Sequence, residues 1–149
     1  MKTTTMQTID QVQDEIIEEF AIFDDWMDKY GLIIEQGNSL EKLDNKYKTP
    51  NNIIEGCQSR VWLHTDYENG RLHFRAESDA VIVKGLLALV LRVFSGRTPD
   101  EIIDADLRFL TEVGLTEHLS PTRSNGLLSV IKQIRYYAIA YKAKDKQEK

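Results

Sequence analysis

Cysteine is nearly absent from this chain, because Cys57 is the only one among 149 residues. A single thiol excludes an intramolecular disulfide, and it also excludes the clustered thiolates of zinc ribbons and protein-bound iron–sulfur clusters. The 3 histidines show no HxxxH or HExxH spacing, so the sequence predicts no metal site. A chain of this length buries roughly two-thirds of its unfolded surface, so it forms a core without a metal or a disulfide.

Phosphate-binding glycine patterns and long apolar runs are also missing. The 8 glycines are too far apart for a dinucleotide-binding GxGxxG or a P-loop. The longest apolar run, Leu86–Leu91, is far shorter than the roughly 20 residues of a membrane-spanning helix. The first ten residues lack the apolar core of a secretory signal. We therefore expect a cytoplasmic protein with no membrane contact and no cofactor of its own.

Basic residues are in the minority, with 19 Lys and Arg against 24 Asp and Glu, for a net charge of −5. This balance argues against general nucleic-acid binding. The segment from Asp10 to Asp28 carries 8 acids and no base, so the remaining 16 acids and 19 bases give the rest of the chain +3. Such a run is either a solvated helix face or a surface that steers a partner.

Helical periodicity dominates the N-terminal part of the chain. Apolar residues recur at steps of three and four from Thr8 to Tyr30, which predicts one long amphipathic helix. A second helix is expected to include residues 32–34 and to end near Gly37. Residues 38–52 are polar and predict a loop.

The period changes to two on either side of Asn69-Gly70, the strongest short hairpin signal. A two-residue turn there pairs residues whose numbers sum to 139 and separates an apolar face from a polar one. The predicted partners are Tyr67 with Leu72, Asp66 with His73, Thr65 with Phe74, Leu63 with Ala76, and Trp62 with Glu77. Ile53 and Ile54 are candidates for a third strand.

Helices are expected to follow the hairpin. Ser78 or Asp79 is a candidate cap for an almost wholly apolar helix that runs to Phe94 and is therefore buried. Thr98-Pro99 and Ser120-Pro121 are start signals for later helices. The sequence thus predicts one α+β domain over residues 1–149. A small curved antiparallel sheet of two to three strands carries helices on one face, and residues 1–7 and 142–149 are frayed.

Cys57 is the residue with the clearest chemical potential. A lone cysteine is more often an inert, buried small hydrophobe than a reactive thiol. Here, however, it lies outside any apolar periodic run, after Gly56 and before Gln58, Ser59 and Arg60. A nearby guanidinium favours the nucleophilic thiolate. No Cys–His pairing at a family spacing is visible, so a thiol that works with another protein's chemistry fits better than a self-sufficient hydrolase.

Three blocks of the sequence closely resemble the SufE family of sulfur-acceptor proteins. They are Gly56–Trp62 (GCQSRVW), Ser78–Leu86 (SDAVIVKGL) and Leu115–Leu127 (LTEHLSPTRSNGL), and they occur in the family's order. The resemblance covers about residues 10 to 140. It implies the SufE/IscU-like fold.

The resemblance also implies a function. A SufS-like pyridoxal-phosphate (PLP) cysteine desulfurase holds sulfur as a persulfide, and the family's acceptor thiolate, at the position of Cys57, attacks the outer sulfur. The carrier stimulates the desulfurase and delivers sulfur to the SufBCD iron–sulfur assembly scaffold. It is an accessory protein rather than a stand-alone enzyme. A CsdE-like acceptor, which serves a different desulfurase and pathway, is the alternative, and a binding module with a structural cysteine is a third interpretation. An IscU-like scaffold would need three cysteine ligands or close substitutes, and this chain has a single cysteine, which argues strongly against that interpretation.

Partner-binding residues are expected around the thiol. They are Gly56, Gln58, Ser59 and Arg60 in the acceptor segment, together with Asp79 and Arg123. Arg123 falls in the first turn of the last helix, where a cation opposes the helix dipole, so we assign it a contact role. His118 is expected to fix a loop rather than act as a base. The family further suggests that Cys57 is sheltered at rest, here by Ile53, Ile54 and Val61. The sequence does not distinguish a monomer from a homodimer.

Overall fold

The computed structural model describes residues 7–54 and 60–148. Seven α-helices, two short 3-10 turns and two strands occur in this part of the chain. Their order is α1 (Ile9–Ala21), α2 (Trp26–Asn38), η1 (Asn45–Tyr47), η2 (Pro50–Asn52), β1 (Val61–Glu68), β2 (Arg71–Ser78), α3 (Val81–Phe94), α4 (Pro99–Asp104), α5 (Phe109–Val113), α6 (Leu115–His118) and α7 (Pro121–Glu148). No helix within these residues is long and apolar enough to cross a membrane.

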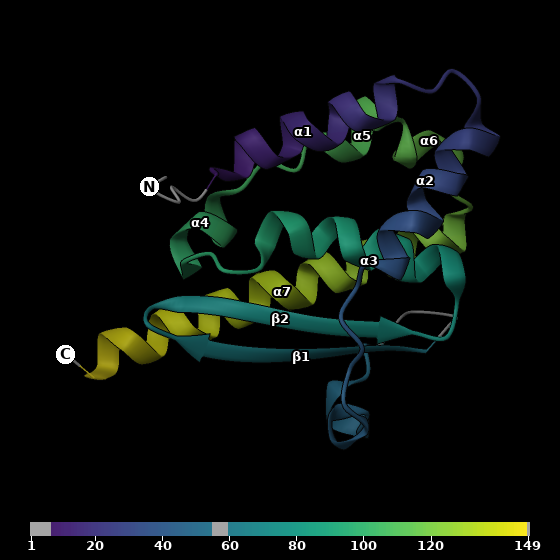
Figure 1. Ribbon diagram of the computed structural model, residues 1–149. Helices are drawn as coiled ribbons and strands as arrows, with labels where there is room; N and C mark the ends of the chain where they lie inside the picture. Colours follow the sequence, from purple (N-terminus) through teal and green to yellow (C-terminus); the bar gives the residue numbers. More distant parts are fainter. Residues whose placement is uncertain (1–6, 55–59, 149) are drawn as a thin grey trace, which may run out of the picture.

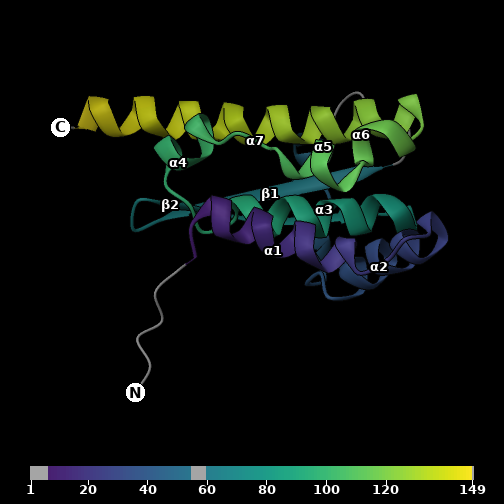
Figure 2. The same ribbon diagram turned by 90° about the horizontal axis from the view of Figure 1, so that it is seen from above.

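The helices lie on one face of a two-stranded antiparallel sheet (Figure 1). α3 and α7 run side by side over the hairpin, and α1 and α2 lie on the far side of α3 (Figure 2). The predicted α+β class, with a small antiparallel sheet and helices on one face, is therefore confirmed. Of the two to three strands predicted, two are formed within the described residues.

The hairpin has the predicted register at every pair. Tyr67 lies opposite Leu72, and the partners named above continue to Val61 opposite Ser78. Asn69 and Gly70 both adopt positive φ, 53° and 76°, as a turn whose twist matches that of the strands requires. The turn residues and the alternation of buried and exposed side chains favour the same register, which is why the sequence alone predicted it.

The expected third strand is reduced to a single bridge. Ile53 pairs with Trp62, and the Ile54 amide donates to the Val61 carbonyl at 2.9 Å. Pro50 lies just upstream in η2, and a proline has no amide with which to extend a ladder. The segment therefore touches the sheet edge only next to residues 55–59.

The single N-terminal helix predicted over residues 8–30 is wrong, because the chain breaks between α1 and α2. Asp25 adopts an extended conformation, and its carboxylate accepts the Met27 amide at 3.0 Å, which makes Asp25 the N-cap of a new helix. Short acidic side chains favour such caps over helix interiors. The apolar spacing continued across the break and concealed it.

The prediction of a frayed tail at residues 142–149 is also wrong for the part that the structure describes. α7 continues to Glu148, and polar side chains hold it. Lys142 forms an ion pair with Asp100, and the Tyr67 hydroxyl donates to Asp145 while its ring stacks on Tyr141. The ion pair and the hydrogen bond are polar, and no apolar repeat continues past Tyr141, so the hydrophobic pattern gave no sign of them.

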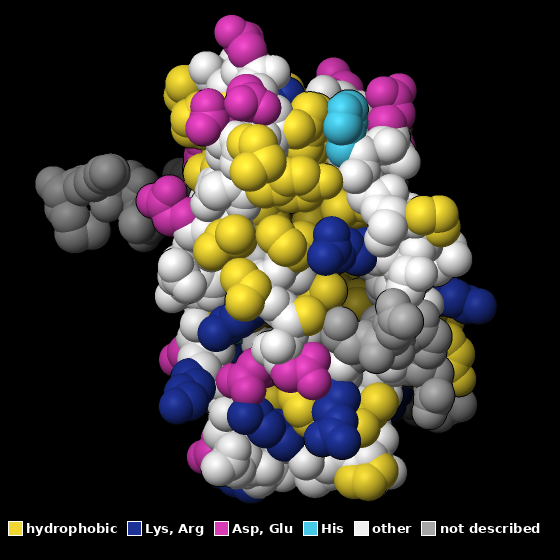
Figure 3. Space-filling model, turned by 90° about the vertical axis from the view of Figure 1, so that its right-hand side faces the viewer, with side chains coloured by type: hydrophobic (Ala, Val, Ile, Leu, Met, Phe, Trp, Pro, Cys, Tyr) yellow, Lys and Arg dark blue, Asp and Glu magenta, His cyan; other side chains and the backbone are white. Residues whose placement is uncertain are grey.

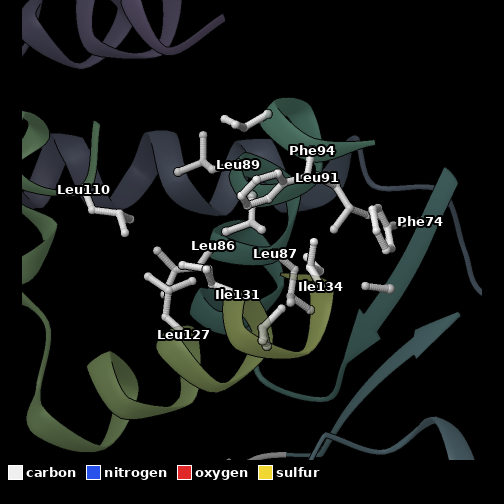
Figure 4. Packing of buried hydrophobic residues seen from close by; sticks show 14 of the residues in the cluster. Phe74, Leu86, Leu87, Leu89, Leu91, Phe94, Leu110, Leu127, Ile131 and Ile134 are labelled. Atoms are coloured by element: carbon white, nitrogen blue, oxygen red, sulfur yellow. The ribbon is translucent and has the colours of Figure 1, made fainter. Parts of the chain in front are cut away.

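The core is organised around α3, whose residues from Gly85 to Leu91 are all buried. Leu86 and Leu87 of this helix lie beside Ile131 and Ile134 of α7 (Figure 4). Phe74 of β2 and Leu110 of α5 close other sides of the same cluster. The sequence-based expectation of a buried central helix is confirmed.

Two glycines bring α2 and α3 into backbone contact. A Cβ atom on Gly85 would lie 2.1 Å from the Ile33 carbonyl oxygen, and one on Gly37 would lie 2.9 Å from the Gly85 nitrogen. Gly37 is buried inside α2, which continues to Asn38. The helix ends one residue later, which confirms the predicted end near Gly37, and Gly37 is in addition a packing residue at the crossing.

Gly85→Ala is therefore expected to destabilise the protein by about 2 kcal/mol or more, because the methyl group collides with backbone that cannot give way. Gly31→Ala is the matched control, since no atom lies within 4 Å of the site in the same helix pair. It is expected to be neutral or to stabilise by up to about 1 kcal/mol through helix propensity. Urea unfolding measures the stability of both variants. Equal stability of the two would contradict a close backbone contact between α2 and α3 at Gly85.

Candidate functional site

The candidate site is described at the two ends of residues 55–59, the segment that contains Cys57. Cys57, Gly56, Gln58 and Ser59 lie outside the described residues. The chain enters the segment from Ile54, which is buried, and leaves it at Arg60, which is exposed. The hydrogen bond from the Ile54 amide to the Val61 carbonyl brings these ends together at the edge of the sheet. The site is thus described by its anchors and by the surface beside them.

Asp79 anchors the exit from the segment. Its carboxylate accepts the Arg60 backbone amide at 3.1 Å, although it lies 19 residues further along the chain. The predicted cap role of Asp79 is wrong, because Ala80 is the N-cap of α3 and has no side-chain cap. Ser78 does not cap the helix either, since its hydroxyl accepts the Ala80 amide at 3.2 Å. The structure therefore brings two predicted partner-binding residues, Arg60 and Asp79, into direct contact.

A groove of about 520 Å³ opens beside these anchors, between the start of α3 and the start of α7. Val61 and Ala80, the neighbours of Arg60 and Asp79, contribute to its wall. The rest of the lining is mostly aliphatic and consists of Val81, Ile82, Val83, Leu86, Leu87, Leu127 and Val130, with Gly126, Ser120, Thr122 and Arg123. An apolar cavity therefore lies next to both anchors.

The end of the molecule that holds this groove has an uneven surface. Hydrophobic side chains gather across its middle (Figure 3). Acidic side chains lie mainly at the top of this face, and Lys and Arg lie mainly in its lower half (Figure 3). Val81, at the first turn of α3, is 61% exposed. A contiguous apolar surface with polar edges is typical of a protein-binding site.

Arg123 is the cation of the groove. The first turn of α7 contains no acid, and the Arg123 amide donates to the Ser120 hydroxyl at 3.3 Å. The Arg123 side chain is exposed, and among the described residues its guanidinium has no hydrogen-bond or ion-pair partner. A cation at this position has no stabilising role in the helix, which agrees with an external ligand.

His118 fixes the corner from which α7 starts. Its ring stacks on Trp26 at 4.0 Å between centroids, and its Nδ1 lies 3.1 Å from the Gly114 carbonyl oxygen. The Tyr30 hydroxyl donates to the His118 carbonyl at 3.0 Å. The ring is thus used for packing, as predicted. Its aromatic partners, Trp26 and Tyr30, come from α2, so no local pattern could identify them.

The other two histidines lie on the outer face of the hairpin. His64 stacks on Tyr47 and lies 3.1 Å from Asp66, and His73 is exposed. Within residues 7–54 and 60–148, no group of three His, Cys, Asp or Glu side chains is arranged to hold a metal ion.

Comparisons with known proteins identify the family. The profile described as SufE, Fe-S metabolism associated domain, matches residues 14–138. The chain belongs to the SufE family. An uncharacterized SufE-like protein of Rhizobium etli is 46% identical over 127 residues, which cover 82% of this chain and 86% of the relative. A second SufE-like protein, from Rhizobium meliloti, is 45% identical and is covered to 91%.

A solved structure supports the fold of this SufE-family chain. The solution structure of a hypothetical protein from Thermus thermophilus matches with a TM-score of 0.71 and 18% sequence identity. The match covers 87% of this chain and 94% of that protein. At this identity the likeness concerns the fold alone.

Asp79→Ala is expected to release the Arg60 amide, because it removes the acceptor of that hydrogen bond. Amide hydrogen exchange at Arg60 should become severalfold faster, while exchange in the interior of α3 should not change. Asp79→Asn keeps an acceptor oxygen and serves as the control. The anchor is refuted if Asp79→Ala and the native chain exchange Arg60 at the same rate.

Proposed function

We propose that this protein is a sulfur acceptor that takes persulfide sulfur from a SufS-like PLP cysteine desulfurase onto Cys57. It stimulates the desulfurase and passes the sulfur to the SufBCD scaffold. One observation carries the proposal. The apolar groove opens where the chain enters and leaves residues 55–59, and most of its lining residues belong to the two other sequence blocks that resemble the family.

The chemistry is thiol–persulfide exchange. The Cys57 thiolate attacks the outer sulfur of the desulfurase persulfide and forms a new S–S bond. The S–S bond within the desulfurase breaks, and its cysteine leaves as a thiolate. No net oxidation occurs, because the sulfane sulfur moves between two thiols. The rate depends on the thiolate fraction and on access to the sulfur, and removal of the sulfur frees the desulfurase for another turnover.

The groove also supports a sheltered resting state for the acceptor. A persulfide or an exposed low-pKa thiol is readily oxidised or reduced in solution. Val61 lines the groove, and Ile54 is buried at the entry of the segment. An aliphatic cavity at this point offers a place where a small sulfur-bearing side chain is covered until a partner docks.

A CsdE-like acceptor is the second candidate. It uses the same chemistry with a different desulfurase and delivers the sulfur to a different pathway. The groove and the anchors are compatible with both partners. Comparing stimulation of the two classes of desulfurase at equal concentration separates the candidates.

Mass spectrometry tests the acceptor directly. After incubation with a desulfurase and free cysteine, the intact chain should gain about 32 Da, one sulfur, and a reductant should remove it. Cys57→Ser should fold normally, bind the desulfurase, gain no mass and give no stimulation. Full stimulation by Cys57→Ser would exclude the carrier mechanism and favour a binding module with a structural cysteine.

Arg123→Ala tests the docking surface. The side chain is exposed on the groove and has no partner among the described residues, so its removal should leave stability within about 0.5 kcal/mol. Binding to the desulfurase should weaken by roughly tenfold if the guanidinium meets a carboxylate. Lys132→Ala, which removes another exposed cation from α7, is the control and should bind normally. Equal affinities of the two variants, measured by calorimetry, would rule out the contact role.

A further inference from the structure

A strap formed by residues 43–54 crosses the outer face of the hairpin and leads directly into residues 55–59 (Figure 1). It contains the turns η1 and η2 and no α-helix. Leu43 and Ile54, at its two ends, are its only buried residues. Packing in the core therefore fixes the ends of the strap, and polar and aromatic contacts must fix the part between them.

Glu77 of β2 holds the strap at two points. One carboxylate oxygen accepts the Leu43 backbone amide at 3.2 Å, and the other forms an ion pair with the Lys48 ammonium group. The Lys48 side chain is 24% exposed and that of Glu77 is 15% exposed, so water screens the pair only in part. The ammonium also lies over the Trp62 ring, 5.7 Å from its centroid. One acidic side chain thus connects two strap residues to the sheet.

Two further contacts extend this restraint toward the acceptor segment. Tyr47 stacks on His64 of β1 with centroids 3.8 Å apart. The Asn52 side chain donates to the Tyr47 carbonyl at 2.7 Å and so ties η2 to η1. From η2 the chain reaches Ile54, whose amide donates a hydrogen bond to the Val61 carbonyl. The contacts that determine where the chain enters residues 55–59 are therefore connected to the Glu77–Lys48 pair.

The ionised form of Glu77 is the one that the site stabilises. Burial by itself would raise the pKa of Glu77, but hydrogen bonds from Lys48 and the Leu43 amide outweigh it, and the pKa lies below its ordinary value. The nearby charges of Lys48 and Lys84 act in the same direction. The carboxylate is therefore charged under ordinary conditions and holds both donors.

We propose that Glu77 and Lys48 are positioning residues for sulfur transfer, because they fix the strap and thereby control how readily Cys57 is reached. The inference deepens the proposed function and rests on Cys57 as the acceptor. Asp79 anchors the exit of the segment through Arg60, and the strap anchors its entry. Fixing the residues at which the chain enters and leaves residues 55–59 lowers the entropy cost of presenting the thiol to a docked partner.

The reactivity of the single thiol in the isolated protein tests this inference. Glu77→Ala removes both strap contacts, and Cys57 should then react with iodoacetamide about tenfold faster, which corresponds to about 1.4 kcal/mol. Glu77→Gln keeps an acceptor for the Leu43 amide, and Lys48→Met removes only the cation, so both should show smaller increases. Hydrogen exchange at the Ile54 amide should accelerate in the same order.

Glu19→Gln is the matched control. Glu19 forms a close ion pair with Arg92, between α1 and α3, and does not touch the strap. It should leave the alkylation rate unchanged even where its melting temperature falls as far as that of Glu77→Gln. The double variant Lys48→Met/Glu77→Gln should react no faster than the faster single variant, since each substitution removes the same Lys48–Glu77 ion pair.

Three results would overturn the inference: native alkylation rates in Glu77→Ala, Glu77→Gln and Lys48→Met; equal acceleration in Glu19→Gln; or fully additive effects in the double variant. If Glu77→Ala does not fold, the Gln and Met variants decide the outcome. These measurements need no desulfurase. Failure of the 32 Da transfer would therefore refute the proposed function separately, without changing the reactivity comparison.

Discussion

The fold depends on covering α3 on all sides. From Gly85 to Leu91 every residue of this helix is buried, and such a helix is stable only when other elements remove its entire circumference from water. The hairpin covers one side, α7 another, and α1 and α2 the remainder. The close approach of α2 is possible only because Gly37 and Gly85 lack side chains. The exposed start of α3 is then left at the edge of the assembly, beside α7 and β1. This is where the groove opens.

Features with local causes could be predicted from the sequence. The hairpin register followed from Asn69-Gly70 and a period of two, and the buried central helix followed from its composition. The break before α2 was missed because apolar spacing runs across it while Asp25 caps the new helix. The tail of α7 was missed because Lys142 and Asp145 are held by charge and hydroxyl contacts with distant residues. Periodicity reports burial, and it carries no information about such pairs.

The site divides in the same way. Local residue chemistry and the resemblance to SufE proteins together singled out Cys57, Arg60, Asp79 and Arg123, and the hairpin register already sets Arg60 opposite Asp79. The register predicts that these two residues are neighbours, but it does not predict that the Asp79 carboxylate accepts the Arg60 amide instead of capping α3. The groove combines residues as far apart as Val61 and Val130. The role of Glu77 had no sequence signal, because an acid on the polar face of a strand is ordinarily solvated.

The acidic N-terminal segment makes intrachain contacts that its charge pattern alone does not reveal. Arg108 lies 2.7 Å from Asp14 and 3.8 Å from Asp10, and Arg92 binds Glu15 and Glu19 at 2.9 and 2.8 Å. Asp25 caps α2. Five of the eight acids thus connect or cap helices. The other three acids of the run, Glu18, Asp24 and Asp28, have no ion pair and no capping role among the described residues. Most acids of the run therefore contribute to the fold, and the other three lie around the α1–α2 connection.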